Sequence, residues 1–325
     1  MQQPILALAD LATPMAVRVA ATLGLADHGE ATAVELASAT GASAPALACL
    51  LDHLVTAGVF AFDAESGRYR PTELGTQLRS EGARRLLDIR SAGGRADLAF
   101  ADLLETITTG RPAYEHRYGR DFWADIDADP RLRRSFDAQM NWRFRVQAPQ
   151  IAARFGWGRF GRIVDVGGGD GAVLAEILRA HPAVRGEVLD LAPSAGAAAQ
   201  RFAAEGLADR AKAVAGSFFD PLPPGADAYV LSDILHDWDD DHAHRILTGC
   251  REAAGEQGTV VVIEPLRAAA GTAMDLFMLM CFGGRERTAA ELADLAAAAG
   301  LVLRTTTEVA EGRTALEFGT APGPG

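Results

Sequence analysis

The chain has 325 residues, of which 49% are apolar and 23% are charged, and its formal net charge at pH 7 is -12. A chain of this length is too long for a single ordinary hydrophobic core, which predicts two domains. The negative net charge argues against a nucleic acid or a membrane as partner. The three cysteines, Cys49, Cys250 and Cys281, have no metal-binding or redox spacing and are odd in number. A reducing cytoplasm is therefore the expected location.

Residues 1–90 have the pattern of a winged-helix module. Apolar residues follow a helical repeat over 5–25, and two short helices are expected at 32–39 and 44–57. The segments 59–62 and 68–71, on either side of a polar turn with Gly67, predict a β-hairpin. Helix, turn, helix and wing follow one another in the order of a winged helix.

DNA binding is the obvious function of a winged helix, but the second short helix argues against it. Residues 44–53, which would enter the major groove, contain no arginine or lysine. Contacts with phosphates require these side chains. A dimerisation platform is therefore favoured over a DNA-binding domain.

From Leu86 to about Phe155 the pattern is helical, with a break at 109–112. Large apolar side chains are concentrated here, and most are expected in the core because an aromatic stripe at helical spacing usually packs there. A minority are expected to line a pocket. We assign residues 91–155 to a helical linker and substrate-pocket region. The large side chains are Phe122, Trp123, Phe136, Met140, Trp142 and Phe144.

Beyond residue 156, predicted strands and helices alternate, which indicates a parallel sheet covered by helices. Strands 301–307 and 314–318, preceded by a helix at 289–299, suit an antiparallel edge. The fold class is therefore α/β: a Rossmann-like, doubly wound, mostly parallel sheet with an antiparallel edge strand, over 156–325, preceded by the α-helical winged-helix domain. Strands are predicted at 162–166, 186–190, 211–215, 227–231 and 258–263, and helices at 170–180, 194–204 and 240–254.

The turn after the first of these strands has the composition of a nucleotide-binding turn. Asp165 lies in the strand, and Gly167, Gly169 and Gly171 follow in G-x-G-x-G spacing, not the G-x-G-x-x-G of dinucleotide enzymes. Glycines allow a ligand to approach the backbone closely, and helix amides favour its polar groups. Asp190 ends the next strand, where it can hold a ribose hydroxyl pair. A plain strand-to-helix turn is the alternative.

His236 follows the strand 227–231, at the edge where a doubly wound sheet binds its ligand. A histidine there suits proton removal from a hydroxyl. The alternative is a loop histidine, with Asp237, Asp239 and Asp240 capping the next helix. Glu264, after the strand 258–263, and Glu286 can orient and stabilise the imidazolium. For Glu286 the alternative is a salt bridge to Arg285 or Arg287.

Six sequence runs in this order and spacing resemble the S-adenosylmethionine-dependent small-molecule O-methyltransferases, the family of plant caffeate and flavonoid enzymes and of bacterial aromatic-polyketide enzymes. The resemblance covers essentially the whole chain, including the winged-helix part. The runs are DVGGGDG, VLDLAP, GSFFDPLP, LHDWDD, VVIEP and MDLFMLMCFGGRERT.

The resemblance implies a role for each of the matching residues. It implies His236 as general base with Asp237, Glu264 and Glu286 beside it, and Arg133 at the cofactor carboxylate. Plant members of the family usually have an aspartate where this chain has Ser217 and a lysine where it has Ser232. In both differences this chain resembles the bacterial anthracycline branch. The remaining cofactor contacts implied are Asp165, Gly167, Gly168, Gly169, Asp190, Leu191, Gly216, Ser217, Phe218 and Ser232. The acceptor contacts implied are Phe136, Met140, Phe144, Trp238, Asp275 and Met278.

These observations predict a homodimeric O-methyltransferase that uses S-adenosyl-L-methionine, releases S-adenosyl-L-homocysteine and methylates an aromatic, polyketide-like natural product without a metal. One alternative is an enzyme of the same fold that performs hydroxylation, decarboxylation or pericyclic chemistry with the bound cofactor. The other is a winged-helix regulator that senses S-adenosylmethionine. The acceptor, its hydroxyl position and the pathway are not predicted by the sequence.

Overall fold

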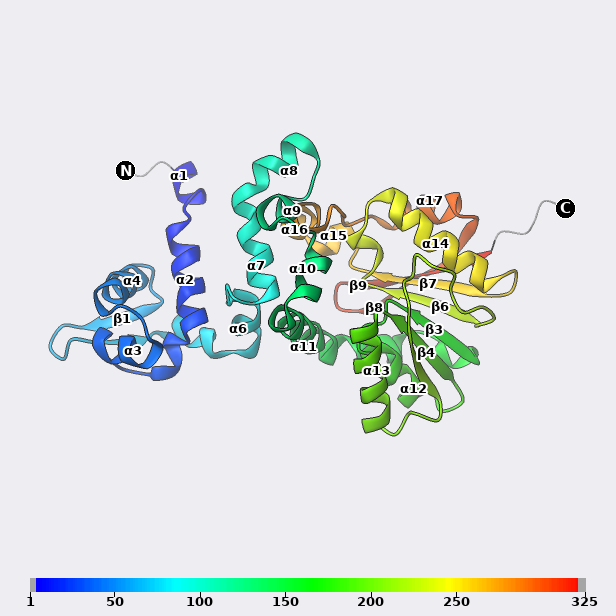
Figure 1. Ribbon diagram of the computed structural model, residues 1–325, viewed down its shortest axis with the longest axis horizontal. Coiled ribbons are helices and arrows are strands. Elements are labelled where there is room, and N and C mark those ends of the chain that lie inside the picture. Colours follow the sequence, from blue (N-terminus) through cyan, green and yellow to red (C-terminus); the bar gives the residue numbers. More distant parts are fainter. Residues whose placement is uncertain (1–3, 321–325) are drawn as a thin grey trace. The chain divides into compact units, whose positions relative to one another are not determined.

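The computed structural model describes residues 4–320 and divides into two compact units (Figure 1). Unit 1 contains the chain up to Leu98 together with Trp123–Gln139. Unit 2 contains Ala99–Phe122 and the chain from Met140 onward. The middle region predicted at 91–155 is thus shared between the two units, and the three predicted domain boundaries stay predictions.

Unit 1 begins with the predicted winged helix. In its core, buried leucines from the helices pack around Phe60 of the hairpin. Within the hairpin, Ala61 lies opposite Arg70. The elements of this unit are α1 (Pro4–Leu8), α2 (Ala12–Leu23), α3 (Ala33–Thr40), α4 (Ala44–Thr56), β1 (Phe60–Asp63), β2 (Arg68–Pro71), α5 (Glu73–Thr76), α6 (Glu81–Leu87), α7 (Ala92–Leu98), α10 (Phe122–Ala128) and the first part of α11 (Pro130–Arg154).

The single helix predicted over 5–25 is wrong, because the structure breaks it into α1 and α2. The Asp10 carboxylate accepts hydrogen bonds from the backbone N–H groups of Ala12 and Thr13 at 3.0 and 3.2 Å, which satisfies the free amides at the start of α2. The apolar repeat continues through this break and conceals it. The region 86–155 likewise has more breaks than the one predicted at 109–112.

Unit 2 contains a seven-stranded sheet in the order β5-β4-β3-β6-β7-β9-β8. Strands β3 to β7 are parallel, and β9 runs antiparallel to both of its neighbours, as predicted. The strands are β3 (Arg162–Val166), β4 (Arg185–Asp190), β5 (Ala211–Ala215), β6 (Ala228–Ser232), β7 (Thr259–Glu264), β8 (Leu301–Ala310) and β9 (Arg313–Thr320). The helices are α8 (Leu103–Thr109), α9 (Ala113–Tyr118), the rest of α11, α12 (Ala172–Ala180), α13 (Ala192–Ala204), α14 (Asp240–Ala254), α15 (Arg267–Ala270), α16 (Thr272–Phe282) and α17 (Ala289–Ala298).

Helices cover both faces of this sheet (Figure 1). Alternate strand residues point to opposite faces, so Ile163 and Val230 pack with α11, α12 and α13, whereas Val164 and Leu231 pack with α14 and α17. Burial on both faces explains why β7 is a continuous apolar run. The carboxyl ends of β3, β4, β6 and β7 meet at one edge, and this edge carries the candidate site.

Among residues 4–320, no single helix is long and apolar enough to cross a membrane. One sharply bent pair, α3 with α4, reaches such a length and composition when its two helices are taken together.

Candidate active site

The turn after β3 borders open space at one glycine. Gly169 has a φ of 60°, and a β carbon built on it meets no atom within 4 Å. Its N–H donates to the Asp190 carboxylate at 2.8 Å, which ties the turn to the end of β4. Neither carboxylate oxygen of buried Asp165 has a hydrogen-bond partner. Burial, followed by the charges of Asp190 and Asp170, raises the pKa of Asp165 to about 7.

Gly167 has a packing role instead. A β carbon built there would lie 2.5 Å from Ile234 and 3.4 Å from the Phe218 ring. The glycine therefore lets the turn after β3 pack directly against the loop after β6. The Ser232 hydroxyl at the end of β6 is buried without a hydrogen-bond partner.

An arginine that the sequence did not single out braces the glycine turn. Arg201 of α13 is ion-paired with Asp170 and donates to the Asp170 carbonyl at 3.0 Å and to the Asn141 side chain of α11 at 2.6 Å. Helix α13 follows Asp190 almost directly, so this arginine joins the elements on both sides of the turn. Each partner is distant in sequence, which explains why spacing did not reveal the contact.

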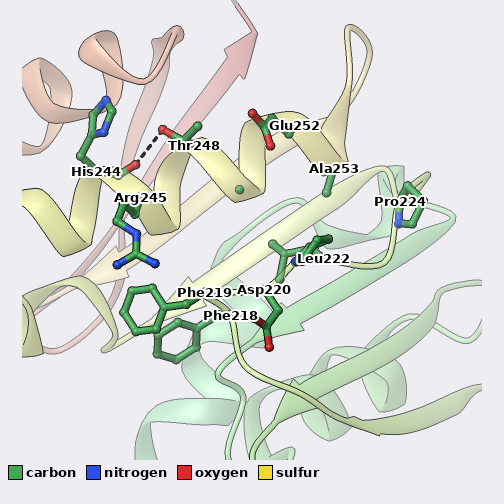
Figure 2. Close-up of a pocket in the computed structure, with 12 residues that line it drawn as sticks. Phe218, Phe219, Asp220, Leu222, Pro224, His244, Arg245, Thr248, Glu252 and Ala253 are labelled. Atoms are coloured by element: carbon green, nitrogen blue, oxygen red, sulfur yellow. Dashed lines mark hydrogen bonds between the residues drawn. The ribbon is translucent and has the colours of Figure 1, made fainter.

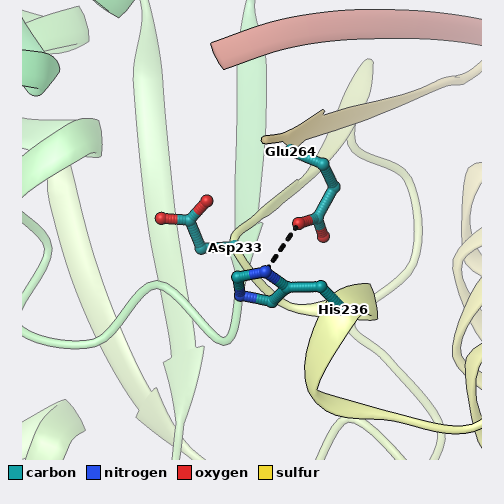
Figure 3. Close-up of side chains that lie close together, drawn as sticks. All are labelled: Asp233, His236 and Glu264. Atoms are coloured by element: carbon teal, nitrogen blue, oxygen red, sulfur yellow. Dashed lines mark ion pairs between the residues drawn. The ribbon is translucent and has the colours of Figure 1, made fainter. Parts of the chain in front are cut away.

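His236 lies in a short turn, Leu235–Asp237, and is only 5% exposed. Its Nδ1 is 3.1 Å from Glu286 Oε1 and 3.6 Å from Glu264 Oε2, and its Nε2 is 3.6 Å from Asp237 Oδ1. Figure 3 shows the pair with Glu264 and the nearby Asp233. The four residues predicted as the catalytic group are thus brought together, although their roles stay predictions.

The two glutamates hold the imidazole in different ways. Glu264 Oε1 accepts the backbone N–H groups of Ile234 and Leu235 at 3.1 and 2.7 Å, so this carboxylate also fixes the turn. Glu286 is fully buried, and its own N–H donates to Asp275 at 3.1 Å. Asp275 also pairs with Arg267 at 2.7 Å. In this structure Asp275, predicted to contact the acceptor, supports Glu286.

Burial and charge act in opposite directions on these groups. Burial lowers the pKa of His236, but the carboxylates of Glu264, Asp237 and Glu286 outweigh it and raise the pKa to about 10. Burial raises the pKa of Glu264 to about 7 and that of Asp237 to about 6, against the opposing charge of His236. The cluster therefore favours an imidazolium in contact with carboxylates.

The geometry also shows which of the acids near His236 cap or brace α14 and which contact the imidazole. Asp239 caps α14 by accepting the His242 N–H at 2.8 Å, and Asp240 pairs with Arg285 and Arg287 at 3.1 and 2.8 Å. Asp237 is left beside the imidazole. Glu286 bonds to His236 and not to the adjacent arginines, which favours the orienting role over the salt bridge.

Phe218, a predicted cofactor contact, belongs to an aromatic group. Phe218 packs edge-on against Phe219 and Trp238, with ring centroids 4.9 and 5.9 Å apart. Trp238, predicted to contact the acceptor, thus belongs to the group that contains Phe218. A surface groove of about 520 Å³ runs between these phenylalanines and α14, where Arg245 lies over the Phe219 ring (Figure 2).

Other predicted cofactor residues occupy the ends of β4 and β5. Leu191 follows Asp190 and is 44% exposed. The Gly216 N–H donates to the Asp190 carbonyl at 2.9 Å, and the Ser217 hydroxyl accepts the Phe219 N–H at 3.1 Å. Arg133 lies in unit 1, where it pairs with Asp127 and Asp137.

The predicted acceptor residues are divided between the two units. Phe136 belongs to unit 1 and packs edge-on against Trp123 at 5.6 Å, whereas Met140, Phe144 and buried Met278 belong to unit 2. Sequence reasoning missed an aromatic group on α16, in which Phe277 packs with Phe100 and Phe282 at 6.2 and 6.0 Å. Helix α16 packs against the turn of His236.

The ligand atoms of Asp233, His236 and Glu264 all lie within 4.8 Å of one another, a spacing that suits a metal ion. However, the Asp233 carboxylate is ion-paired with Arg143 and lies 3.0 Å from Nε of Arg313. Two guanidinium groups at this carboxylate oppose a further cation. We therefore assign no metal to these three residues.

Comparison with known proteins explains this arrangement. Residues 100–302 match an O-methyltransferase domain family, and residues 6–81 match an O-methyltransferase dimerisation domain. The chain belongs to the O-methyltransferase family. It is 54% identical over 306 residues, 92% of each chain, to the 2,7-dihydroxy-5-methyl-1-naphthoate 7-O-methyltransferase of Streptomyces carzinostaticus. It is 42% identical to the aclacinomycin 10-hydroxylase of Streptomyces purpurascens, over 96% of this chain and 86% of that one.

A solved structure of the same family matches both units. The neocarzinostatin O-methyltransferase NcsB1, in complex with S-adenosylmethionine and 2-hydroxy-5-methyl naphthoic acid, superposes with a TM-score of 0.92 at 52% identity, covering 97% of this chain and 98% of that chain. These matches confirm the predicted fold, the enzyme class, the S-adenosylmethionine cofactor and the dimerisation domain. The open cradle at Gly169 and the unpartnered carboxylate of Asp165 fit this cofactor.

Proposed function

We propose that this methyltransferase methylates a phenolic hydroxyl of a fused-ring aromatic acid, such as a hydroxynaphthoate, with His236 as general base. The matches above 50% identity support the acceptor class, because the sequence match is named for a dihydroxynaphthoate and the structure match holds a hydroxynaphthoic acid. The half-buried rings of Phe277 and Phe282 support it as well. They lie on the helix that packs against the His236 turn, and flat apolar rings suit a flat acceptor.

The buried contact between His236 and Glu286 carries the mechanism. Glu286 accepts the Nδ1–H. In the neutral imidazole, which is the form that acts as the base, Nε2 therefore bears the lone pair that takes the phenol proton. A phenol has a pKa of about 10, which matches the raised pKa of His236, about 10. Proton transfer between such groups is close to thermoneutral. Glu264 and Asp237 then stabilise the imidazolium.

S-adenosylmethionine supplies an electrophilic methyl group to this site. Asp165, Gly169, Asp190 and Ser232 are the residues that would hold it, since they border the open cradle or carry buried polar atoms. Burial of His236 and Glu286 excludes water from the proton acceptor and strengthens its interaction with the carboxylates.

The variant His236→Ala tests the proposed base. We expect kcat to fall by about 100- to 10,000-fold, the usual range for loss of a general base, while the cofactor Kd measured by calorimetry stays unchanged. Raising the pH toward the pKa of the acceptor should restore part of the rate, because hydroxide then forms the phenolate. Wild-type turnover by this variant at neutral pH would contradict the assignment.

A second candidate function is hydroxylation, and the 42% identity to an aclacinomycin hydroxylase favours it. The His236 cluster argues for methyl transfer, because proton removal is the chemistry that it serves. Incubation with hydroxynaphthoates and cofactor labelled in the methyl group distinguishes the two. A product that carries the label supports methyl transfer, and an unlabelled product with a new hydroxyl group supports the second function.

We also propose that the enzyme works in the cytoplasm. Cys49 and Cys250 are free thiols, and Cys250 is buried. Such cysteine usage is typical of a reducing compartment.

A further inference from the structure

Asp233 has an unusual backbone conformation for its residue type. Its φ is 55°, and it is the only non-glycine residue with positive φ among residues 4–320. Aspartate tolerates this left-handed region better than most side chains, yet the conformation still costs free energy. The strained residue follows β6 directly and precedes His236 by three positions, and its N–H donates to the Ile263 carbonyl at 2.9 Å.

Two arginines from distant elements meet on the Asp233 carboxylate. Arg143 of α11 is ion-paired with Oδ2, and Arg313 at the start of β9 lies 3.0 Å from Oδ1. The Asp233 side chain is only 8% exposed, and that of Arg313 is 12% exposed. Desolvating three charges is costly, and well-packed apolar residues often replace such groups without loss of stability. A contribution to stability alone is therefore a weak explanation for this cluster.

Arg143 connects the cluster to the predicted acceptor wall. It lies on α11 between Met140 and Phe144, and its guanidinium is 5.6 Å from the centre of the Phe144 ring. Arg313 precedes Thr314, the residue of β9 that lies opposite Glu264 in the sheet. Asp233 is thus the point at which α11, the His236 turn and the β7–β9 pair meet.

Charged groups from three parts of the chain face the His236 imidazole. Glu264 belongs to β7, Glu286 to the segment between α16 and α17, and Asp237 to the turn itself. The Asp233 carboxylate lies within 4.8 Å of the imidazole as well, and it brings the charges of Arg143 and Arg313 with it. Removal of Asp233 would change both the anchoring of the turn and the charge beside the base.

We propose that Asp233 is a positioning residue for methyl transfer: its contacts with Arg143 and Arg313 fix the turn that presents His236 and join that turn to the helix of Met140 and Phe144. The inference rests on the proposed function of His236. It adds a residue whose type and position in the sequence do not indicate a role, and it makes base alignment depend on α11.

The variant Asp233→Asn tests the role of the charge. Asparagine has nearly the same size and also tolerates a left-handed φ, so the backbone is preserved while the ion pairs are lost. We expect kcat to fall by about 10- to 100-fold, since small displacements of reacting groups have effects of this order. The cofactor Kd should change by less than about twofold, because the glycine turn and Asp190 are untouched.

Glu187→Gln is the matched control. It removes a buried carboxylate in the first half of β4, which pairs with Arg162 at 3.2 Å and lies away from the carboxyl edge that carries His236. We expect this variant to lower Tm as much as Asp233→Asn does and to leave kcat unchanged. Equal losses of kcat in the two variants would overturn the inference, because any broken ion pair would then be sufficient.

The pH dependence of kcat gives a readout that a structural role alone would not change. Asp233 is one of the anions that raise the pKa of His236, so the rise of kcat with pH should shift to lower pH in Asp233→Asn. An unshifted profile with a wild-type kcat would overturn the inference. His236→Ala is assayed in parallel. If that variant keeps its turnover, the proposed base fails; if it loses turnover while Asp233→Asn does not, only the positioning role fails.

Discussion

The two loops at the same edge of the sheet, after β3 and after β6, are built on opposite principles. The loop after β3 has room: at Gly169 no atom lies within 4 Å of where a side chain would begin. The loop after β6 is filled with charge, since His236 is buried among carboxylates and Asp233 lies between two arginines. A cofactor cradle needs space, whereas a base needs an environment that sets its pKa and orientation.

The largest expected effect concerns the space in the first loop. Gly169→Val should abolish cofactor binding, because it places a branched side chain in the cradle. Valine at a φ of 60° also strains the backbone by about 1–2 kcal/mol, so loss of binding must be separated from loss of stability. Calorimetry measures the cofactor affinity, and thermal unfolding reports the strain.

Gly206→Val is the matched control for this strain. Gly206 has a φ of 68°, and no atom lies within 4 Å of the position that a β carbon would take there. It lies after α13, outside the candidate site. This variant should lose a similar amount of stability and retain full cofactor affinity. If both variants bind the cofactor equally well, the cradle lies elsewhere, and the contrast between the two loops fails.

The next effect concerns the charge in the second loop. Glu264→Ala leaves the N–H groups of Ile234 and Leu235 without their acceptor, and burial of two such donors should cost about 2–4 kcal/mol of unfolding free energy. Glu264→Gln retains an oxygen that accepts both, so it should stay close to wild type in stability. Chemical denaturation measures the difference.

Turnover of the same pair of variants separates anchoring from charge. Glu264→Gln should lose some activity through its missing charge, but less than His236→Ala, because the base remains. Glu264→Ala should lose more than Glu264→Gln. Equal stability of the two variants would show that the backbone contacts of Glu264 are not what holds the turn.

The contrast between the loops after β3 and β6 also explains which parts of the fold and the site could be predicted from the sequence. The strands around the glycine turn were placed to within a residue or two, because β6 and β7 are largely apolar runs and because glycines and Asp190 occur at short distances after β3. His236, Glu264 and Glu286 could be found through the strand ends and the family resemblance. Local pattern is sufficient for these features.

The arginine contacts could not be predicted. In a sequence, an arginine that is exposed on the surface looks the same as one that pairs with an acid far along the chain. Arg143 and Arg313 lie 90 and 80 residues from Asp233 along the chain, and nothing local distinguishes them from the other arginines. The break at Asp10 was missed for the opposite reason, because its single capping side chain lies within an uninterrupted apolar repeat.

The smallest expected effect concerns Asp165, the buried acid near the end of β3, just before the first loop. The pKa of Asp165 is raised from 3.8 to about 7 by burial, so the folded chain retains a proton that the unfolded chain releases over this pH range. Stability due to this group therefore falls as pH rises from about 4 to about 7 and is constant above. Asp165→Asn cannot titrate, so its unfolding free energy should fall less over this window than that of the wild type. Exposed Asp209→Asn serves as the control for loss of a carboxylate. If Asp165→Asn and wild type show the same slope, this carboxyl is neutralised by a partner, and the first loop depends on charge as the second one does.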